Sequence, residues 1–444
     1  EVLPALGLPD DALVEVGEGD WLPSRLPVGE LAVGSVAAAA LAGLAVCRGA
    51  RSRVSARQVA VAFSSERYTT IDGRRPEAFA PLSGFFQTAD GWVRTHGNYP
   101  HHRAALEGVL RLSDDATREV AAAALRERTA QEVEDLVTEA GGLAVRVRTS
   151  AEWFAGGPAA AVDTHPLLAC EATGEEAGEG TSEGTSEAPG RPLPERPRVL
   201  DLTRVIAGPV ASRTLAHLGC DVLRVDSPRL PEIPWQHIDT SGPKRSTLLD
   251  LTAAVDRGRF EELLSRADVL LSGYRPGALT AFGLDPDALA ERHPHLVQAS
   301  LSAWTPSGPW GGRRGFDSIV QAATGISMVE SADGERPGAL PAQALDHATG
   351  YLVAAGICAA LRQRAQLGGT WRVSAHLART AHWLLRASRK GEGRPVGAAD
   401  DLLQTSQTPS GQVTHPRPAF RIDDRPAEFV RFGGPLGGDE PRWL

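Results

Sequence analysis

The sequence has few cysteines. Its 444 residues include four, Cys47, Cys170, Cys220 and Cys358, which lie far apart and form no Cys-x-x-Cys pair. Structural zinc sites and disulfide scaffolds depend on closely spaced or numerous cysteines. We therefore expect reduced thiols packed among apolar neighbours, and no metal site.

Positive charge is scarce, and it comes almost entirely from arginine. Lys and Arg together number 46 against 55 Asp and Glu, so the formal net charge is -9. General nucleic-acid binding needs a basic surface, so this charge balance predicts no nucleic-acid partner. The chain contains only two lysines, Lys244 and Lys390.

Long hydrophobic runs are missing as well. No stretch reaches the roughly 18 apolar residues that a membrane-spanning helix needs. The nearest, residues 32–47, is rich in Ala and Gly and is better interpreted as a buried helix. No basic segment followed by an apolar stretch marks a signal peptide at the beginning. We therefore expect a cytoplasmic protein with no membrane partner.

Aromatic residues make up only 5% of the chain, so Ala, Val and Leu must fill its core. A chain of 444 residues exceeds the usual size of one hydrophobic core, which predicts two or more domains. Residues 171–197 read EATGEEAGEGTSEGTSEAPGRPLPERP and are too polar to bury an apolar core. We interpret them as a flexible acidic linker between two folded parts.

After this linker, short apolar segments alternate with helical patterns. Strands are predicted at residues 199–203, 221–225, 246–251, 268–272, 296–301 and 371–374, and helices at 208–217, 255–267, 344–364 and 376–385. This alternation is typical of an α/β fold in which a parallel, Rossmann-like sheet carries helices on both faces.

In the part before the linker, the residue pattern predicts a smaller α+β domain. Residues 85–95 indicate a hairpin with its turn at Asp90-Gly91. Helices are predicted at residues 33–46, 102–111, 115–128 and 129–140.

An internal repeat links the two parts. Residues 28–34 (VGELAVG) align with residues 344–350 (ALDHATG), an offset of 316 (350 − 34). Each is followed by an Ala-rich helix and then by Arg-Val-Ser-Ala, which begins at Arg53 in one part and at Arg372 in the other. Two matches in the same order favour a partial duplication.

Five segments in a fixed order carry a family resemblance. They are VLDLTRVIAGP with LGCDVLRVD (199–209, 218–226), KRS with LDL (244–246, 249–251), ADVLLSGYRPGA with FGL (267–278, 282–284), GFDSIVQAATG (315–325) and LDHATG (345–350). Together they resemble the family III CoA-transferases, a group that includes formyl-CoA and carnitine CoA-transferases and α-methylacyl-CoA racemases. The resemblance extends from residue 199 to about residue 385.

The order of the parts departs from that family. Residues 85–156 resemble the family's small domain, which normally follows the catalytic aspartate, and here they precede it. The expected domains are a partial first copy of the large domain (1–80), the small α+β domain (81–170), the linker (171–198), the CoA-binding large domain (199–390) and a tail that returns to the large domain (391–444). The Gly-rich loop that formyl-CoA transferases place over the nucleophile is not recognisable. The resemblance implies a homodimer, possibly interlaced.

By its place in the motif, Asp346 resembles the family's nucleophile. A carboxylate there attacks an acyl-CoA thioester to give a mixed anhydride, and CoA thiolate then returns to give an aspartyl-CoA thioester. An acceptor carboxylic acid takes CoA by the reverse steps. A helix N-cap is the structural alternative for Asp346, and the helix N-terminus is expected to keep its carboxylate ionised. Glu30 holds the same place in the first copy, and we interpret it as a vestige.

The resemblance also implies the CoA contacts. Lys244, Arg245 and Arg275 stand where the family binds CoA, with Arg224 as a weaker candidate. The alternative is that they are solvated surface charges at strand and helix ends. The substrates implied are an acyl-CoA and a small carboxylic acid, whose identities the sequence does not specify.

Several further alternatives stay open at this stage. Racemases of the group carry a histidine at the place of Phe316, so half of their acid–base pair is missing here. Asp317 is either a hydrogen-bonding structural residue or a minor active-site contact. His347 either assists the nucleophile or is a helix-capping or surface residue. A non-catalytic CoA-binding scaffold is the alternative from another class. A dinucleotide oxidoreductase is less favoured, because no Gly-x-Gly-x-x-Gly follows the first strand at residues 199–203.

Overall fold

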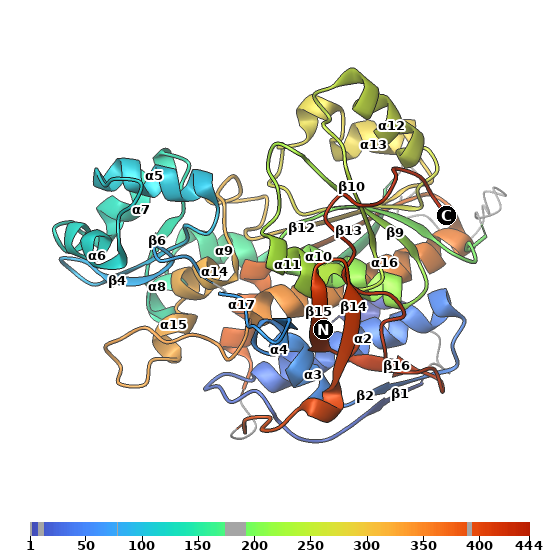
Figure 1. Ribbon diagram of the computed structural model, residues 1–444, viewed down its shortest axis with the longest axis horizontal. Coiled ribbons are helices and arrows are strands. Elements are labelled where there is room, and N and C mark those ends of the chain that lie inside the picture. Colours follow the sequence, from blue (N-terminus) through green and yellow to red (C-terminus); the bar gives the residue numbers. More distant parts are fainter. Residues whose placement is uncertain (1, 8–12, 78, 174–191, 389–392) are drawn as a thin grey trace.

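A seven-stranded sheet forms the centre of the molecule (Figure 1). The computed structural model describes residues 2–7, 13–77, 79–173, 192–388 and 393–444; most of the predicted linker, residues 174–191, lies outside them. The strand order is β10-β9-β8-β11-β12-β13-β7. Six strands are parallel: β8 (Arg198–Leu202), β9 (Asp221–Asp226), β10 (Arg245–Leu248), β11 (Val269–Ser272), β12 (Val297–Ser302) and β13 (Thr370–His376). This confirms the predicted parallel sheet.

Helices cover both faces of this sheet. Alternate strand residues point to opposite faces, so Val199 and Val269 pack into one core while Leu200 and Leu270 pack into a second one. The first core contains α10 (Ala207–His217) and α16 (Ala344–Leu367), and the second contains α12 (Ala254–Leu264) and α13 (Pro286–Arg292). Figure 1 shows the two pairs on opposite sides of the strands.

The residues on either side of the small domain, before the linker, are built into this large domain. Helix α2 (Val28–Cys47) packs along α16, and β7 (Ala169–Thr173) adds an antiparallel edge strand beside β13. The sequence had not predicted β7, because its pairing partner lies about 200 residues away. Helices α1 (Leu3–Leu6), α3 (Ala56–Phe63) and α4 (Ser65–Tyr68) also belong to this segment.

The C-terminal tail pairs with that same segment. Strands β1 (Leu13–Val16), β2 (Arg51–Val54) and β16 (Phe420–Ile422) form one small sheet, and β3 (Thr70–Ile71), β14 (Leu403–Thr408) and β15 (Gly411–Pro416) form another. The end of the tail reaches the large sheet, where the Leu444 N–H donates to Asp221 at 2.8 Å. The tail therefore contacts the large domain in two places, the segment before the small domain and the large sheet.

The small domain has a core of its own and projects to one side (Figure 1). Its sheet is β4 (Gly84–Gln87), β5 (Trp92–Thr95) and β6 (Ala144–Arg146), covered by α5 (Pro100–Leu110), α6 (Arg118–Arg126) and α7 (Ala130–Glu139). The hairpin and its turn are where the sequence predicted them. Helices α8 (Ser150–Phe154) and α9 (Gly157–Asp163) already pack on the large domain, so the small domain ends near β6, ahead of the expected limit at residue 170.

Shorter elements complete the described part of the chain. They are α11 (Pro234–Ser241), α14 (Asp317–Thr324), α15 (Ile326–Val329), α17 (Leu377–Arg386) and the 3-10 turns at Thr280–Phe282 and Asp400–Leu402.

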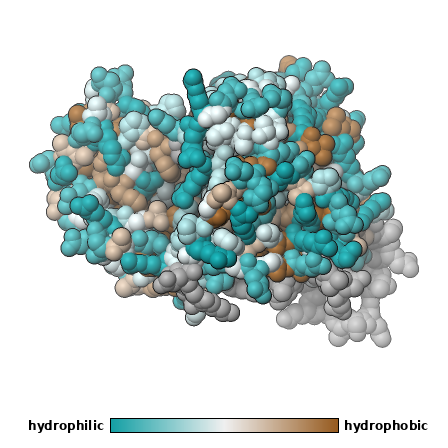
Figure 2. Space-filling view, turned by 60° about the horizontal axis from the view of Figure 1, so that its bottom comes forward, coloured by the Kyte–Doolittle hydropathy of each residue, from teal (hydrophilic) through white to brown (hydrophobic). Residues whose placement is uncertain are grey.

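Two helices have the length and apolar composition of a membrane span, contrary to the expectation from the sequence. These are α2 and α16, but 67% and 100% of their most apolar windows are buried inside the fold, where the two helices pack together. This burial is typical of core helices. Figure 2 shows a face on which hydrophilic residues predominate and apolar residues appear in scattered groups, which is ordinary for a protein surface.

Candidate active site

Asp346 lies in the first turn of α16, where this helix presses against α10. A side chain at Gly350 would place its Cβ 2.3 Å from the Ala207 carbonyl oxygen, so this close approach requires glycine. The contact holds the start of α16 inside the fold. As a result the Asp346 side chain is almost fully buried, with an exposed fraction of 5% for the residue.

A second carboxyl group, that of Asp317 at the start of α14, lies beside Asp346. The Asp346 N–H donates to Asp317 Oδ2 at 3.0 Å, and the Gln321 side-chain amide donates to Asp317 Oδ1. Burial raises the pKa of Asp346 well above its usual range, and the neighbouring Asp317 charge raises it further. Burial also raises the pKa of Asp317 to about 6. Desolvation therefore opposes the ionised state that the helix N-terminus was expected to favour.

Asp346 faces a small cavity of about 60 Å³, which we call the Asp346 cavity. Its walls come from both halves of the chain. The lining residues are Glu66, Phe79, His96, Asn98, Tyr99, Val205, Ile206, Ile233, Trp235, Gln236, Phe316, Ser318, Gln343 and Asp346. A space of this size holds a few water molecules or one small reacting group.

His96 follows strand β5 and is one of the residues that sequence reasoning missed. Its imidazole stacks on the Phe316 ring with centroids 4.1 Å apart, and its Nδ1 has no hydrogen-bond partner. The residue is 6% exposed. Burial lowers the pKa of His96 to about 3, so the ring is neutral. The run His96-Gly-Asn-Tyr-Pro-His-His was visible in the sequence, but nothing there connected it to Asp346.

Glu66, on α4, is the other missed residue. Its Oε2 is buried without a hydrogen-bond partner. Burial raises the pKa of Glu66 to about 7, with a further increase from the charge of Asp239. This glutamate therefore titrates near neutral pH at the edge of the Asp346 cavity.

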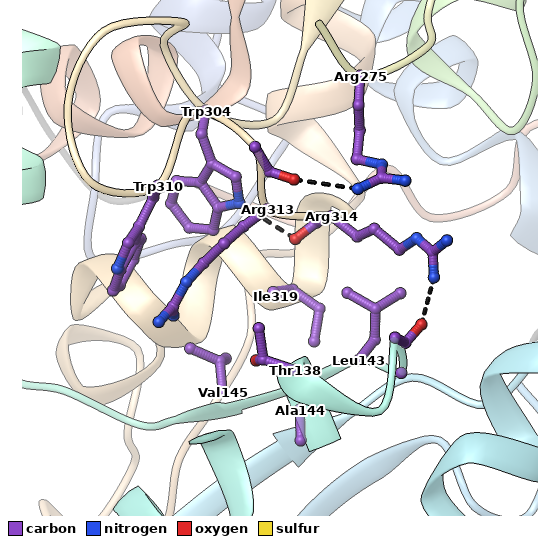
Figure 3. Close-up of a pocket in the computed structure, with 13 residues that line it drawn as sticks. Thr138, Leu143, Ala144, Val145, Arg275, Trp304, Trp310, Arg313, Arg314 and Ile319 are labelled. Atoms are coloured by element: carbon purple, nitrogen blue, oxygen red, sulfur yellow. Dashed lines mark hydrogen bonds between the residues drawn. The ribbon is translucent and has the colours of Figure 1, made fainter. Parts of the chain in front are cut away.

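A second cavity, of about 160 Å³, lies between the large and small domains (Figure 3). We call it the arginine cavity, because Arg275, Arg313 and Arg314 line it together with Trp304 and Trp310. Figure 3 shows these basic and aromatic side chains facing the small-domain residues that complete the wall. Burial and the charge of Arg275 lower the pKa of Arg314, so an anion placed here relieves an existing repulsion.

The arginine cavity and the Asp346 cavity are close neighbours. The rings of His102 and Phe316 have centroids 6.0 Å apart, and Phe316 lines the Asp346 cavity. Burial lowers the pKa of His102 to about 3, and the charges of Arg314 and Arg275 contribute to this shift. The charges of two arginines that line the arginine cavity therefore act on His102, and the His102 ring also packs against Phe316 in the wall of the Asp346 cavity.

The sheet topology directs a ligand to this place. The chain runs from β8 to one side of the sheet and from β11 to the other, so the strand order reverses between these neighbours. In open α/β sheets, ligands bind in the crevice beyond the strand ends at such a reversal. Val205 and Ile206, which follow β8, line the Asp346 cavity, and Arg275, which follows β11, lines the arginine cavity.

Backbone strain marks the same crevice. Val205 has a φ of 70°, which a β-branched residue rarely adopts. Its N–H donates to Glu232 Oε2 at 2.8 Å, and this contact holds the unusual conformation. Strain of this kind is concentrated at functional sites, where the surrounding structure maintains it.

A larger cavity of about 500 Å³ lies over strands β11, β12 and β13 and shares Arg275 with the arginine cavity. It has the volume of a typical small-molecule site. The buried Gln298 amide lines it, and neither its nitrogen nor its oxygen has a hydrogen-bond partner. Asp346 does not line this cavity.

The other predicted CoA contacts are buried in ion pairs. Arg224 binds Asp226 at 2.7 Å and Glu232 at 3.1 Å, and Arg245 binds Asp221 at 2.9 Å. The Arg245–Asp221 pair links the neighbouring strands β10 and β9, whereas Arg224 pairs within β9 and with the loop that follows it. Both arginines are buried, so neither is the solvated surface charge of the alternative. Their contact with CoA stays a prediction.

Lys244 is buried in the same way. Its ammonium group donates to Ser212 Oγ at 2.9 Å and pairs with Asp201 at 3.4 Å. Burial lowers the pKa of Lys244 to about 8. Lys244, Arg224 and Arg245 together line a small cavity of about 10 Å³. Arg275 lines the arginine cavity instead and uses one guanidinium nitrogen to donate to the Gly312 carbonyl at 3.1 Å.

His347 and Glu30 lie apart from the Asp346 cavity. The His347 ring is buried against Phe63 with centroids 5.1 Å apart, and neither ring nitrogen has a hydrogen-bond partner. It is therefore a core residue and not the capping residue of the alternative. Glu30 is exposed in the first turn of α2. No group of three or more His, Cys, Asp or Glu within the described ranges is placed to hold a metal ion.

Comparison with known proteins gives one family. The sequence model of the family described as CoA-transferase family III matches residues 196–427. A probable fatty acyl-CoA transferase of Mycobacterium tuberculosis, Rv3272, is 33% identical over 40% of this chain and 49% of its own length. An acyl-CoA transferase of Gibberella moniliformis is 31% identical over 66% of this chain and 55% of its own length.

Another relative is the formyl-CoA:oxalate CoA-transferase of Streptomyces coelicolor, 29% identical over 55% of this chain and 58% of its own length. The chain spans about half the length of the curated relatives that it matches. Among solved structures, a crystal structure of Rv3272 matches 44% of this chain and 58% of that chain, with 32% identity and a TM-score of 0.40.

Proposed function

The chain belongs to CoA-transferase family III, and we propose that it moves CoA from an acyl-CoA to a carboxylic acid with Asp346 as the nucleophile. The observation that carries this proposal is the buried carboxyl of Asp346 at the start of α16, facing a cavity where both halves of the chain meet.

The reaction starts with the ionised Asp346 carboxylate. One of its oxygens attacks the thioester carbonyl, the carbon–sulfur bond breaks, and CoA thiolate leaves behind a mixed anhydride. The thiolate then attacks the Asp346 carbonyl and releases the donor acid as a carboxylate. An acceptor carboxylate attacks the resulting aspartyl-CoA thioester, and returning thiolate forms the new acyl-CoA and restores Asp346. Atoms and charges balance at each step.

The cavities suit the two ends of an acyl-CoA. The Asp346 cavity has room for the thioester carbonyl. In the arginine cavity, the guanidinium groups of Arg275 and Arg314 match phosphate oxygens, whereas Arg313 already pairs with Glu134 at 2.8 Å. Both cavities lie near the end of the crevice between β8 and β11, where Val205 and Ile206 follow one strand and Arg275 follows the other. The larger cavity that shares Arg275 has room for the adenosine part. An acidic chain thus provides local positive charge where the phosphates are expected.

One chain supplies both large-domain and small-domain walls of the Asp346 cavity. The family resemblance predicted a homodimer, possibly interlaced. We infer that the rearranged order lets a single chain enclose the nucleophile, since Glu66 and His96 precede the linker and Asp346 follows it.

The racemase alternative has less support. It needs a base beside Asp346 that removes the proton α to the thioester. The ring at the motif position is Phe316, and the pKa of about 3 that burial gives the adjacent His96 makes it a weak base.

The decisive test is intact-protein mass spectrometry after mixing the chain with a panel of acyl-CoAs. We expect the wild-type chain to gain the mass of CoA less one water, and Asp346→Asn to gain nothing. Glu30→Gln is the matched control, because Glu30 holds the equivalent place in α2, and it should form the adduct. If CoA binds but no donor gives an adduct, the chain is a non-catalytic CoA-binding scaffold and the proposal fails.

A further inference from the structure

Each attack in the proposed reaction turns a carbonyl oxygen into an oxyanion beside the buried carboxyl group of Asp346. An oxyanion in such a place needs a fixed hydrogen-bond donor, which is often the largest single contribution to catalysis. In this family member the Gly-rich loop expected over the nucleophile is not recognisable from the sequence. The donor must therefore be sought among the residues that line the Asp346 cavity.

Two of those lining side chains have a buried polar atom without a hydrogen-bond partner among the described residues: Glu66 Oε2 and His96 Nδ1. An unsatisfied buried polar atom destabilises the fold, and a ligand that bonds to it removes that cost. An ionised carboxylate accepts hydrogen bonds and repels an oxyanion, so Glu66 is unsuitable as a donor in that state. The imidazole of His96 has an N–H to donate.

The surroundings of His96 hold its ring in place. Its backbone N–H donates to the Leu143 carbonyl at 3.0 Å, and its ring stacks on Phe316 at 4.1 Å. Phe316 directly precedes Asp317, which accepts the N–H of Asp346. The His96 ring is thus linked to Asp346 through Phe316 and Asp317. Because these contacts hold the ring in place, it does not have to move when negative charge develops on the substrate oxygen.

We propose that His96 is a catalytic residue that donates a hydrogen bond to the oxyanions formed at Asp346. This inference rests on the function proposed above. A neutral imidazole can polarise a carbonyl oxygen in this way without losing its proton. Burial and the charge of Arg94 lower the pKa of His96, so the ring stays neutral across the pH range of the reaction.

His102 provides a matched control from the same aromatic cluster. It is 5% exposed, its Nδ1 lacks a hydrogen-bond partner, and its ring lies 6.5 Å from that of His96. It does not line the Asp346 cavity. A role that depended only on burial or ring packing would therefore affect both histidines alike.

The test uses the full chain with three substitutions: His96→Phe, His96→Gln and His102→Phe. Phenylalanine keeps the stacking on Phe316 and removes the N–H, whereas glutamine restores a donor. We expect His96→Phe to lower kcat about 10²- to 10³-fold, as loss of one oxyanion donor does elsewhere, with KM for the acyl-CoA changed less than about 3-fold. His96→Gln should recover at least about 10-fold of that loss, and His102→Phe should keep kcat within about 3-fold.

Two results would overturn the role of His96. One is an unchanged kcat in His96→Phe, and the other is an equal loss in His102→Phe, which would show a packing effect. Thermal unfolding of each variant checks the fold, and His96→Gln decides the question if His96→Phe does not fold. The mass-spectrometry experiment on the wild-type chain separates the two proposals. If the wild-type chain forms the adduct and His96→Phe keeps full activity, only the role of His96 is wrong. If the wild-type chain forms no adduct, the transferase proposal itself is wrong.

Discussion

Helices α2 and α16 both begin with a turn that carries a carboxylate, Glu30 in the first and Asp346 in the second. Both are Ala-rich, both are followed by Arg-Val-Ser-Ala, and they pack against each other. Glu30 is exposed, whereas Asp346 is buried beside Asp317 and His96. The same helix start thus gives a surface charge in one copy and a carboxyl with a strongly raised pKa in the other. Enclosure by other elements, and not the local motif, makes the difference.

The aligned glycines repeat this contrast. A Cβ at Gly350 would lie 2.3 Å from the Ala207 carbonyl oxygen, while a Cβ at Gly34 would meet nothing within 4 Å. Only the second copy therefore uses its glycine to bring α16 against α10. That contact in turn sets the depth at which Asp346 is buried.

The largest expected difference between the two copies is catalytic. Asp346→Asn should lower kcat by about 10⁴-fold or more, because it removes the group that forms both covalent intermediates. Glu30→Gln should leave kcat within about 2-fold, since its side chain does not reach the cavity. Steady-state rates of acyl-CoA consumption measure both. A comparable loss in Glu30→Gln would mean that the first copy takes part in the chemistry.

The glycine pair should differ in stability. Gly350→Ala forces α16 away from α10 and should lower the free energy of unfolding by about 1–3 kcal/mol, the usual cost of overpacking. Gly34→Ala should raise it by up to about 1 kcal/mol, because alanine favours the helix and meets no neighbour. Chemical denaturation of the two variants gives both values. Equal effects would contradict the close approach that distinguishes the copies.

The pH dependence of the reaction should reflect the raised pKa that burial gives Asp346. The nucleophile must be ionised, and its raised pKa means that the ionised fraction rises with pH. We expect kcat/KM to fall on the acid side with an apparent pKa well above the usual range of an aspartate. Asp317→Asn removes a neighbouring negative charge and should move this acid limb down by about 1 pH unit.

An acid limb that stays in place in Asp317→Asn would show that burial alone sets the ionisation. His102→Phe serves again as the control, because it changes the same cluster without adding or removing a carboxyl group. Its acid limb should coincide with that of the wild-type chain.

Much of the fold could be predicted from local patterns. The parallel strands of the second part are short apolar runs bounded by Gly, Pro or Asp, and the hairpin carries a clear Asp-Gly turn. The edge strand β7 and the short strands β1 and β3 were missed, since each pairs with a segment far away in the sequence. The order of the small domain before the linker was visible, but its packing against Asp346 was not.

The candidate site was predicted only in part for the same reason. The motif indicated Asp346, but its pKa depends on Asp317 and on burial that the sequence does not reveal. Glu66 and His96 come from segments about 250 to 280 residues away and match no motif for this chemistry. The charges of Lys244 and Arg224 were expected to face CoA, yet each has a buried acidic partner that only the folded chain brings near.

The packing of α2 along α16 has a consequence for how the protein is made. A chain grows from its amino terminus, so α2 is synthesised about 300 residues before the helix that covers it. During that time its apolar surface and the unpaired edge of β7 have no native partner, although the small domain has a core of its own and can fold early. The nascent chain is therefore most prone to aggregate until β13 and the C-terminal tail have been synthesised.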